Sequence, residues 1–381
     1  MKILFIYSEI VVEIVEKKFH HNFLSDIINR YEKFGDLTVI TSAIEVQSSN
    51  HQIISCQDNI KFRFINKENT LSTRFFNRTT NKKIIEEEIA KTDFIIIHVP
   101  CSVQDLTAQY ARKYNKPYLA LVVGCPWDSL WNHSWKGRLL APFSYLGLRR
   151  FMRNTSWAMY VTNVFLQSRY PSPGRTVGCS DVSLPKADES IINDRIARIN
   201  NDNIEPSIAS IGALIKVKGH SDVIRALSLL KKKGQLFTYH LIGGGDNTAL
   251  RLLAKKYNVE NQIKFHGVLP HNEIFLILRT ISIYIQPSKT EGICRALVEA
   301  MSMGCPAIAT NVGGNPELIE EQWLYRPKDI ATLATKISKL YQKENMLHAA
   351  TSNYSAALKY QQDILDKRRD EFIDQAIKNY S

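Results

Sequence analysis

No apolar segment of this chain approaches the roughly 20 residues that a membrane-spanning helix requires. The six cysteines are scattered and form no C-x-x-C pair, so neither a metal or redox motif nor a disulfide framework is indicated. Low-complexity tracts and short repeats are missing as well. Glu9 and Glu13 interrupt the opening apolar stretch, and no small-residue cleavage site follows it. We therefore expect a first core strand rather than a signal peptide, and a cytoplasmic protein.

Length and composition indicate a globular protein of two domains. The chain has 381 residues, of which 44% are hydrophobic and 23% are charged, as is usual for globular domains of ~100–200 residues each. Its 49 Lys and Arg against 37 Asp and Glu give a formal net charge of +12. Such a charge attracts nucleic acid, an anionic bilayer or phosphorylated substrates, and it does not choose among them.

Short apolar runs alternate with amphipathic stretches, which is typical of parallel sheets covered by helices. Strands are expected near 3–7, 36–41, 93–99, 117–123 and 158–162, and again near 207–214, 237–243, 262–267, 282–287 and 306–310. Helices are expected near 13–33, 80–91, 103–115, 220–233, 246–257, 272–280 and 293–303, and through the tail from 329 to 380.

The segment 169–190 is rich in Pro, Gly and Ser and is predicted to link two doubly wound α/β domains. We assign 1–180 to an N-terminal domain and 181–361 to a C-terminal domain. The last helix, 362–381, is expected to pack back toward the N-terminal domain.

The segment 287–319 carries the most specific pattern. An apolar stripe with helical spacing begins at Ile293 and predicts a helix that faces a sheet. Glu291 precedes this helix and Glu299 lies eight residues later, ~12 Å along the axis. Helix N-termini bind phosphate because their first N–H groups are unpaired and the dipole is positive there. One carboxylate near each end of a bound diphosphate suits a sugar nucleotide, whereas a solvated surface glutamate pair is the alternative.

E-x7-E with Gly292 after the first Glu, followed by E-A-M-x-x-G-x-P-x-I-A-T-x-x-G-G-x-P-E, resembles the C-terminal domain of family 4 retaining glycosyltransferases, which have the GT-B fold. The upstream segments 211–227, 240–256 and 263–269 resemble the same family in the right order and spacing. The resemblance implies two Rossmann-like domains that face each other across a cleft, with C-terminal helices. Residues 1–180 would bind the acceptor, and residues 181–361 would bind the nucleotide sugar. It is specific over about 205–320 and weaker over the N-terminal half.

The resemblance also implies roles for individual residues. Lys218 would contact the donor diphosphate, Glu291 would hold the donor sugar and Glu299 the ribose. The full predicted donor site comprises Gly212, Lys218, Gly243, Gly244, Gly245, His266, Gly267, Val268, Leu269, Glu291, Gly292, Ile293, Cys294, Arg295 and Glu299. Glu291 and Lys218 are also the predicted catalytic residues of this domain.

Two departures from the family pattern stand out. Many members carry an Arg as a second phosphate clamp where this chain has Ala213, for which Lys216 or Arg295 could compensate. The segment 8–16, which in relatives holds a Gly-Gly loop, contains no glycine. A close backbone approach by a ligand is therefore not expected there.

The acceptor side is predicted from 122–171, which resembles enzymes of bacterial capsule, O-antigen and exopolysaccharide biosynthesis. Asp128 and His133 are the candidate acceptor residues, because a carboxylate and an imidazole beside Trp127 and Trp131 suit carbohydrate recognition. Core packing of the two tryptophans is the alternative. His98, at the end of another strand, is a further candidate for lining the cleft.

The segment 136–153 mixes large apolar and basic residues. Such a stretch can lie on an anionic membrane surface at the cytoplasmic face of the inner membrane, and a buried helix with a solvated basic face is the alternative. The resemblance to polysaccharide enzymes implies a polyprenyl-diphosphate-linked glycan acceptor, which would explain both a membrane contact and the positive charge.

The sequence thus predicts a retaining, hexosyl-type transferase that moves a sugar from a UDP- or GDP-sugar to a glycan hydroxyl, with no cofactor and no metal. The absence of an Asp-x-Asp triplet agrees with a site that uses no metal. A sugar-nucleotide 2-epimerase or a phosphorylase on the same fold are alternatives. A nucleic-acid-binding protein is disfavoured, because no helix-turn-helix or RNA-stacking motif accompanies the charge.

Overall fold

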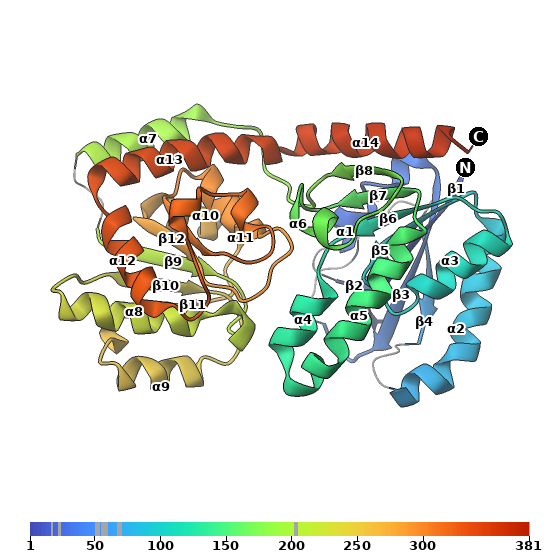
Figure 1. Cartoon of the computed structure of the whole chain (residues 1–381), viewed down its shortest axis with the longest axis horizontal. Coiled ribbons are helices and arrows are strands. Elements are labelled where there is room, and N and C mark those ends of the chain that lie inside the picture. Colours follow the sequence, from blue (N-terminus) through green and yellow to red (C-terminus); the bar gives the residue numbers. More distant parts are fainter. Residues whose placement is uncertain are drawn as a thin grey trace. The chain divides into compact units, whose positions relative to one another are not determined.

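The computed structural model describes residues 1–16, 18–21, 24–49, 54, 60–66, 71–201 and 205–380. The chain forms two compact units, each with its own sheet (Figure 1). The first unit comprises Met1–Pro126, Pro142–Asp181 and Asp366–Ser381, and the second comprises Trp127–Ala141 and Val182–Leu365. The predicted α/β class with two parallel sheets is confirmed.

The sheet of the first unit has the strand order β4-β3-β1-β5-β6-β7-β8, and β2 is added antiparallel to β1. β5 is buried at every position, as expected for a central strand of a parallel sheet whose two faces are covered. The strands are β1 (Lys2–Val15), β2 (Lys18–His20), β3 (Asp36–Glu45), β4 (Ile60–Ile65), β5 (Phe94–Val99), β6 (Tyr118–Val122), β7 (Trp157–Tyr160) and β8 (Arg175–Gly178).

Helices connect these strands, and the carboxyl-terminal helix joins them. The segment of α14 from Asp366 onward belongs to this unit, where Phe372 packs edge-on against Trp157 with ring centroids 5.2 Å apart. Before α14, the helices of this half of the chain are α1 (Leu24–Ile28), η1 (Glu32–Phe34), α2 (Leu71–Lys91), α3 (Gln104–Lys113), α4 (Pro126–His133), α5 (Trp135–Arg153) and α6 (Phe165–Arg169). Of these, α4 from Trp127 and α5 as far as Ala141 group with the second unit.

Three predictions for the first half need correction. The predicted helix over 13–33 is wrong, because β1 continues to Val15, where it pairs with β3 and β2, and α1 covers only Leu24–Ile28. The β-branched run from Val11 to Val15 favours the extended backbone. The edge strand β4 was not predicted, although its apolar residues alternate with Lys61 and Arg63. The predicted linker 169–190 contains the edge strand β8.

The second unit has a six-stranded parallel sheet in the order β11-β10-β9-β12-β13-β14. Buried positions fill β12 and β13 completely, which places them at the centre of the core. The strands are β9 (Ser207–Ile211), β10 (Thr238–Ile242), β11 (Ile263–Gly267), β12 (Ile283–Gln286), β13 (Ala307–Thr310) and β14 (Leu324–Tyr325).

The helices of this unit cover both faces of its sheet: α8, α9 and α12 lie on one side, and α7, α10, α11 and α13 on the other (Figure 1). Their bounds are α7 (Glu189–Asn200), η2 (Lys216–Lys218), α8 (His220–Lys232), α9 (Thr248–Lys256), η3 (Glu260–Gln262), α10 (His271–Thr280), α11 (Arg295–Ser302), η4 (Asn315–Glu317), η5 (Glu321–Trp323), α12 (Ile330–Leu340), α13 (Lys343–Ala357), η6 (Leu358–Tyr360) and α14 (Gln362–Lys378). The predicted strands and helices of this half are confirmed to within a few residues.

The carboxyl ends of β9, β10 and β12 meet at one edge of this sheet because all three strands are parallel neighbours. Ligands of open parallel sheets bind beyond this edge. Every helix within the described ranges is too short or too polar to span a bilayer.

Candidate donor site

The loop that follows β12 is held by backbone contacts on two sides. On one side, the N–H of Lys289 donates to the carbonyl of Val217 at 2.8 Å. On the other side, the N–H of Gly314 donates to the carbonyl of Gly292 at 2.7 Å. A Cβ at Gly313, whose φ is +56°, would lie 2.0 Å from the carbonyl oxygen of Glu291. Only glycine therefore permits this close approach of the two backbone segments.

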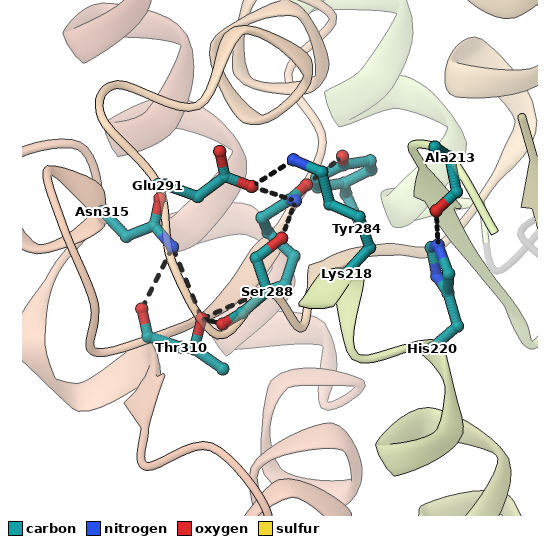
Figure 2. Close-up of polar contacts among 9 residues, drawn as sticks. Ala213, Lys218, His220, Tyr284, Ser288, Glu291, Thr310 and Asn315 are labelled. Atoms are coloured by element: carbon teal, nitrogen blue, oxygen red, sulfur yellow. Dashed lines mark hydrogen bonds and ion pairs between the residues drawn. The ribbon is translucent and has the colours of Figure 1, made fainter. Parts of the chain in front are cut away.

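Within this loop, Glu291 forms an ion pair with Lys218 from η2 (Figure 2). The Nζ atom of Lys218 lies 2.7 Å from Oε1 of Glu291, and the two side chains are 28% and 11% exposed. Burial opposes the charge of Lys218, but the nearby Glu291 carboxylate outweighs it and raises the pKa of Lys218. The site thus holds a protonated lysine beside a carboxylate at neutral pH. The structure brings these two predicted catalytic residues together across 73 positions of sequence.

A buried polar network that was not predicted adjoins the ion pair (Figure 2). The amide of Gln286 donates to Oε1 of Glu291 at 3.2 Å and to the hydroxyl of Ser288 at 2.8 Å. Tyr284 donates its hydroxyl hydrogen to the amide oxygen of Gln286 at 2.6 Å. Thr310 donates to the carbonyl of Ser288 at 2.6 Å. Polar residues within and just after a strand predicted to be buried were the available signal for this network.

Glycine-rich strand ends lie beside the loop. The N–H of Gly212 donates to the carbonyl of Ile242, and the N–H of Gly243 donates to that of Gly267, at 2.9 and 2.7 Å. The carbonyl of Gly244 accepts from Leu214 at 2.8 Å. Backbone contacts therefore bring Gly212, Gly243, Gly244 and Gly267 together at the ends of β9, β10 and β11. Val268 projects from this edge and is 80% exposed.

A histidine pair lies at the same edge. The His266 ring stacks on that of His240 with centroids 5.1 Å apart, and Nδ1 of His240 lies 3.1 Å from Nε2 of His266. Burial, together with the neighbouring His266 and Lys264, lowers the pKa of His240 to about 4. Burial and Lys264 also lower the pKa of His266. Both imidazoles are therefore neutral at pH 7 and can act as hydrogen-bond donors or acceptors toward a ligand.

The start of α11 combines buried side chains with backbone that faces the loop. Ile293 and Cys294 are 7% and 4% exposed, and Cys294 is the N-cap residue. Burial and the nearby Glu291 carboxylate raise the pKa of the Cys294 thiol, which stays protonated. The first N–H groups of any helix lack intrahelical acceptors, so this end can receive an anion. One turn later, Glu299 lies 3.3 Å from Nε2 of His271, an ion pair only when that histidine is protonated.

The substitutes considered for the missing arginine are exposed. Lys216, on η2, and Arg295, at the start of α11, are both exposed, and neither contacts the Lys218–Glu291 pair within the described part of the chain. Ala213 is also exposed, and its carbonyl lies 3.3 Å from Nε2 of His220 (Figure 2). Burial lowers the pKa of His220 to about 4, so this imidazole is neutral and braces the Ala213 turn.

The candidate acceptor residues lie on α4, which groups with the second unit. Trp127 and Trp131 stack with centroids 5.3 Å apart, and the amide of Asn132 donates to the carbonyl of Lys289 at 3.3 Å. Asp128 is half-buried and His133 is exposed. Neither side chain is recorded in contact with Glu291 or Lys218 within the described chain. The described residues also contain no cluster of three or more His, Cys, Asp or Glu that could hold a metal ion.

In the first unit, residues 8–15 of the segment 8–16 are part of β1 rather than a loop. Its register with β3 shifts between Ile6 and Val11. Glu9 accepts a hydrogen bond from the N–H of Ser102 at 2.8 Å. His98 is 7% exposed and stacks on Tyr7 with centroids 3.8 Å apart.

Comparisons with known proteins identify the family. Residues 192–356 match the family described as Glycosyl transferases group 1. Protein CapJ of Staphylococcus aureus is 33% identical over 364 residues, which cover 91% of this chain and 89% of CapJ. The chain belongs to the group 1 glycosyltransferases. The amylovoran biosynthesis glycosyltransferase AmsK of Erwinia amylovora is 36% identical to this glycosyltransferase over 147 residues, 36% of each chain.

Among solved structures, HepE of Anabaena in complex with UDP matches with a TM-score of 0.68 at 18% identity, covering 98% of this chain and 100% of HepE. This likeness confirms the predicted GT-B fold class of the glycosyltransferase. The prediction that the chain is a glycosyltransferase is confirmed by its family. The comparisons lend no support to the epimerase, phosphorylase or nucleic-acid alternatives.

Proposed function

We propose that this glycosyltransferase moves a sugar from a nucleoside diphosphate sugar to a hydroxyl of a glycan acceptor during the synthesis of a bacterial surface polysaccharide. The Lys218–Glu291 pair in front of α11 carries the proposal, because it joins a cation and a carboxylate at the edge where open parallel sheets bind ligands. The names of two proteins add support. AmsK is named for amylovoran biosynthesis, and HepE is described in complex with UDP and with UDP-glucose.

The proposed chemistry follows from charge. Negative charge develops on the diphosphate as the sugar leaves, and donors fixed in advance around it lower the barrier. Lys218 and the N-terminal end of α11 supply this stabilisation, and the proposal requires no cofactor and no metal ion. Glu291 accepts hydrogen bonds from hydroxyls of the donor sugar. Glu299 holds the ribose, and the backbone around 243–245 and 266–269 receives the base.

The central experiment measures nucleoside diphosphate release from a panel of UDP- and GDP-sugars, with and without lipid-linked acceptor extracted from bacterial membranes. Release that depends on acceptor supports a transferase, whereas formation of a 2-epimer without acceptor contradicts it. Glu291→Gln should lower the transfer rate at least a hundredfold while leaving UDP or GDP affinity within about threefold, since the nucleotide contacts remain. Glu344→Gln, an exposed glutamate on α13, is the matched control. Full activity of Glu291→Gln would remove the central assignment.

We further propose that the acceptor is a polyprenyl-diphosphate-linked glycan and that the protein works peripherally at the cytoplasmic face of the inner membrane. The support is one face of α5. Five large apolar side chains on this helix are more than half exposed: Trp135 (68%), Leu139 (65%), Leu140 (56%), Phe143 (73%) and Leu146 (61%). The opposite face is buried through Ala141, Leu148 and Met152.

Basic residues accompany this apolar face. Lys136 and Arg138 are exposed near its start, and Arg150 and Arg153 continue it toward the end of α5. An apolar helix face flanked by cations is the composition that binds in the plane of an anionic bilayer interface. The same charges would attract the diphosphate of a lipid-linked acceptor.

Vesicle sedimentation tests the membrane proposal. The protein should bind vesicles that contain phosphatidylglycerol more tightly than vesicles of phosphatidylcholine alone, and added salt should weaken this binding. Combined replacement of Leu139, Phe143 and Leu146 by Ser should reduce binding at least tenfold. The matched control replaces three similarly exposed apolar residues elsewhere, Val164, Leu236 and Leu252, by Ser. Equal binding by the two triple variants would contradict this docking surface.

A further inference from the structure

Gln286 lies at the end of β12 with its amide sealed inside the second unit. The residue is 1% exposed. Its Nε2 donates to the Ser288 hydroxyl at 2.8 Å and to Oε1 of Glu291 at 3.2 Å. A buried amide is costly unless its groups are bonded, and here both the nitrogen and the oxygen have partners.

Tyr284 determines which way this amide points. Tyr284 and Gln286 are two residues apart on one strand and therefore share a face of the sheet. The Tyr284 hydroxyl donates to Oε1 of Gln286 at 2.6 Å, which makes that atom the oxygen and directs the NH₂ group toward Glu291. Burial raises the pKa of Tyr284 well above its usual range, so the hydroxyl keeps its proton. A flipped amide would place its oxygen against the Glu291 carboxylate.

The orientation of the Gln286 amide makes the two carboxylate oxygens of Glu291 unequal. Oε1 accepts from both Lys218 and Gln286, whereas no partner of Oε2 is recorded among the described residues. An ammonium group is a rotatable point charge and does not by itself set the plane of a carboxylate. The second, directional bond from a buried amide sets that plane. Oε2 is then the oxygen available to a ligand.

We propose that Tyr284 and Gln286 are positioning residues, which act in series to orient the Glu291 carboxylate so that its Oε2 accepts a hydrogen bond from a hydroxyl of the donor sugar. The proposal rests on the donor-sugar role given to Glu291 above. It adds two residues that touch neither substrate nor reacting atoms.

The test measures how much more tightly the protein binds a sugar nucleotide than the matching nucleotide. The probes are UDP-glucose against UDP and GDP-mannose against GDP, by calorimetry, using the pair for which the wild type shows a preference. Gln286→Leu should reduce this preference about tenfold, since a hydrogen bond to a charged group is lost. Tyr284→Phe should reduce it about threefold. The double variant should lose no more than Gln286→Leu alone, because the two residues act through one chain of bonds.

Two further variants distinguish a role in orienting the Glu291 carboxylate from a general loss of protein stability. Gln286→Glu places a second carboxylate beside Glu291, so its loss of preference should recover as the pH is lowered from about 8 to about 5.5, where one of the two like charges takes up a proton. Tyr160→Phe removes a buried tyrosine hydroxyl that donates to the carbonyl of Tyr170 at 2.7 Å in the first unit. This control should lower thermal stability and leave the binding preference unchanged.

The outcomes distinguish the two proposals. Unchanged preference in Glu291→Gln would overturn the donor-sugar role of Glu291, and the positioning proposal with it. Lost preference in Glu291→Gln but unchanged preference in Gln286→Leu would overturn only the positioning role. If the double variant lost as much binding preference as the two single variants combined, the proposal that Tyr284 acts through Gln286 would also be overturned.

Discussion

At the scale of single residues, His98 is a buried imidazole with little to stabilise a charge. It lies near the carboxyl end of β5, stacked on Tyr7, and its Nδ1 has no hydrogen-bond partner among the described residues. Burial lowers the pKa of His98 from 6.5 to about 3. Between these two values the unfolded chain holds a proton at this position and the folded chain does not. The part of the free energy of unfolding that depends on neutral His98 is therefore fully present above pH 6.5. It decreases as the pH falls toward about 3.

We expect His98→Phe to reduce this acid sensitivity, because phenylalanine keeps a ring beside Tyr7 and cannot take up a proton. In denaturant unfolding, the free energy of the variant relative to the wild type should rise as the pH falls from about 6.5 to about 4, by at most about 1.4 kcal/mol per pH unit. His220 and His240, whose pKa values are also lowered, should leave part of the acid sensitivity in place. A difference that stays constant with pH would contradict the expectation.

Single site residues were predictable from the sequence where a motif fixes both the residue type and its spacing. Glu291 and Lys218 were selected from motif positions, and the structure pairs them. Gln286 and Tyr284 were not selected, because the tetrad that they form with Glu291 and Lys218 exists only once β12 and η2 are neighbours. The roles assigned to Glu291 and Lys218 in the reaction stay predictions.

At the scale of elements, Arg195 ties α7 to the ends of α10 and α11. The residue is 2% exposed, and its guanidinium donates to the carbonyls of Leu278, Ile281 and Met303. These carbonyls lie at or beyond helix C-termini, where the last C=O groups lack intrahelical donors. Arg198, one turn later on α7, is half-buried and donates to the carbonyls of Arg279 and Thr280 through hydrogen bonds that are exposed to solvent.

This pair of arginines allows a matched prediction. Arg195→Met should lower the free energy of unfolding of the second unit by about 3 kcal/mol or more, since the buried carbonyls of Ile281 and Met303 lose this donor. Arg198→Met should cost about 0.5 kcal/mol or less, because water replaces the lost bonds at the surface. Arg195→Lys should recover little, as an ammonium cannot reach the same carbonyls at once. Equal costs for the two methionine variants, measured by urea unfolding, would contradict this account.

Helices and strands were predictable from the sequence where the apolar residues follow one clear period, either that of a helix or that of a strand. The second half alternates apolar strands with long amphipathic helices, and those elements appear within a few residues of their predicted bounds. The run from Val11 to Val15 contains both apolar and acidic residues, so its spacing fits a helix as well as a strand. This run forms a strand because it pairs with β3, and the sheet gives these β-branched residues a surface on which to pack.

At the scale of the whole molecule, the chain ends in a helix that is shared between the two units. The segment from Asp366 belongs to the first unit, although it follows the second unit in sequence. Phe372 is 7% exposed against Trp157, and Arg369 is 3% exposed and donates to the carbonyl of Ser180. The segment from Asp366 onward therefore contributes buried side chains to the core of the first unit.

Phe372→Ala should destabilise the first unit selectively, by about 3–5 kcal/mol, the usual cost of removing a buried aromatic ring. Hydrogen exchange should accelerate in β7 and β8, which lie next to this ring, and should stay unchanged in β12 and β13. Nucleotide binding should persist, because the proposed donor site lies within the second unit. Equal acceleration in both sheets would mean that the units unfold together, contrary to the prediction.

The residues alone specify the class of fold and the family, because apolar periodicity and the E-x7-E segment are local properties of the chain. Tertiary structure decided what depends on neighbours distant in sequence. It ordered the strands, extended β1 and built the Tyr284–Gln286–Glu291–Lys218 network. The physical reason is that hydrogen bonds and burial join atoms that become close only after folding, and no spacing along the chain encodes that proximity.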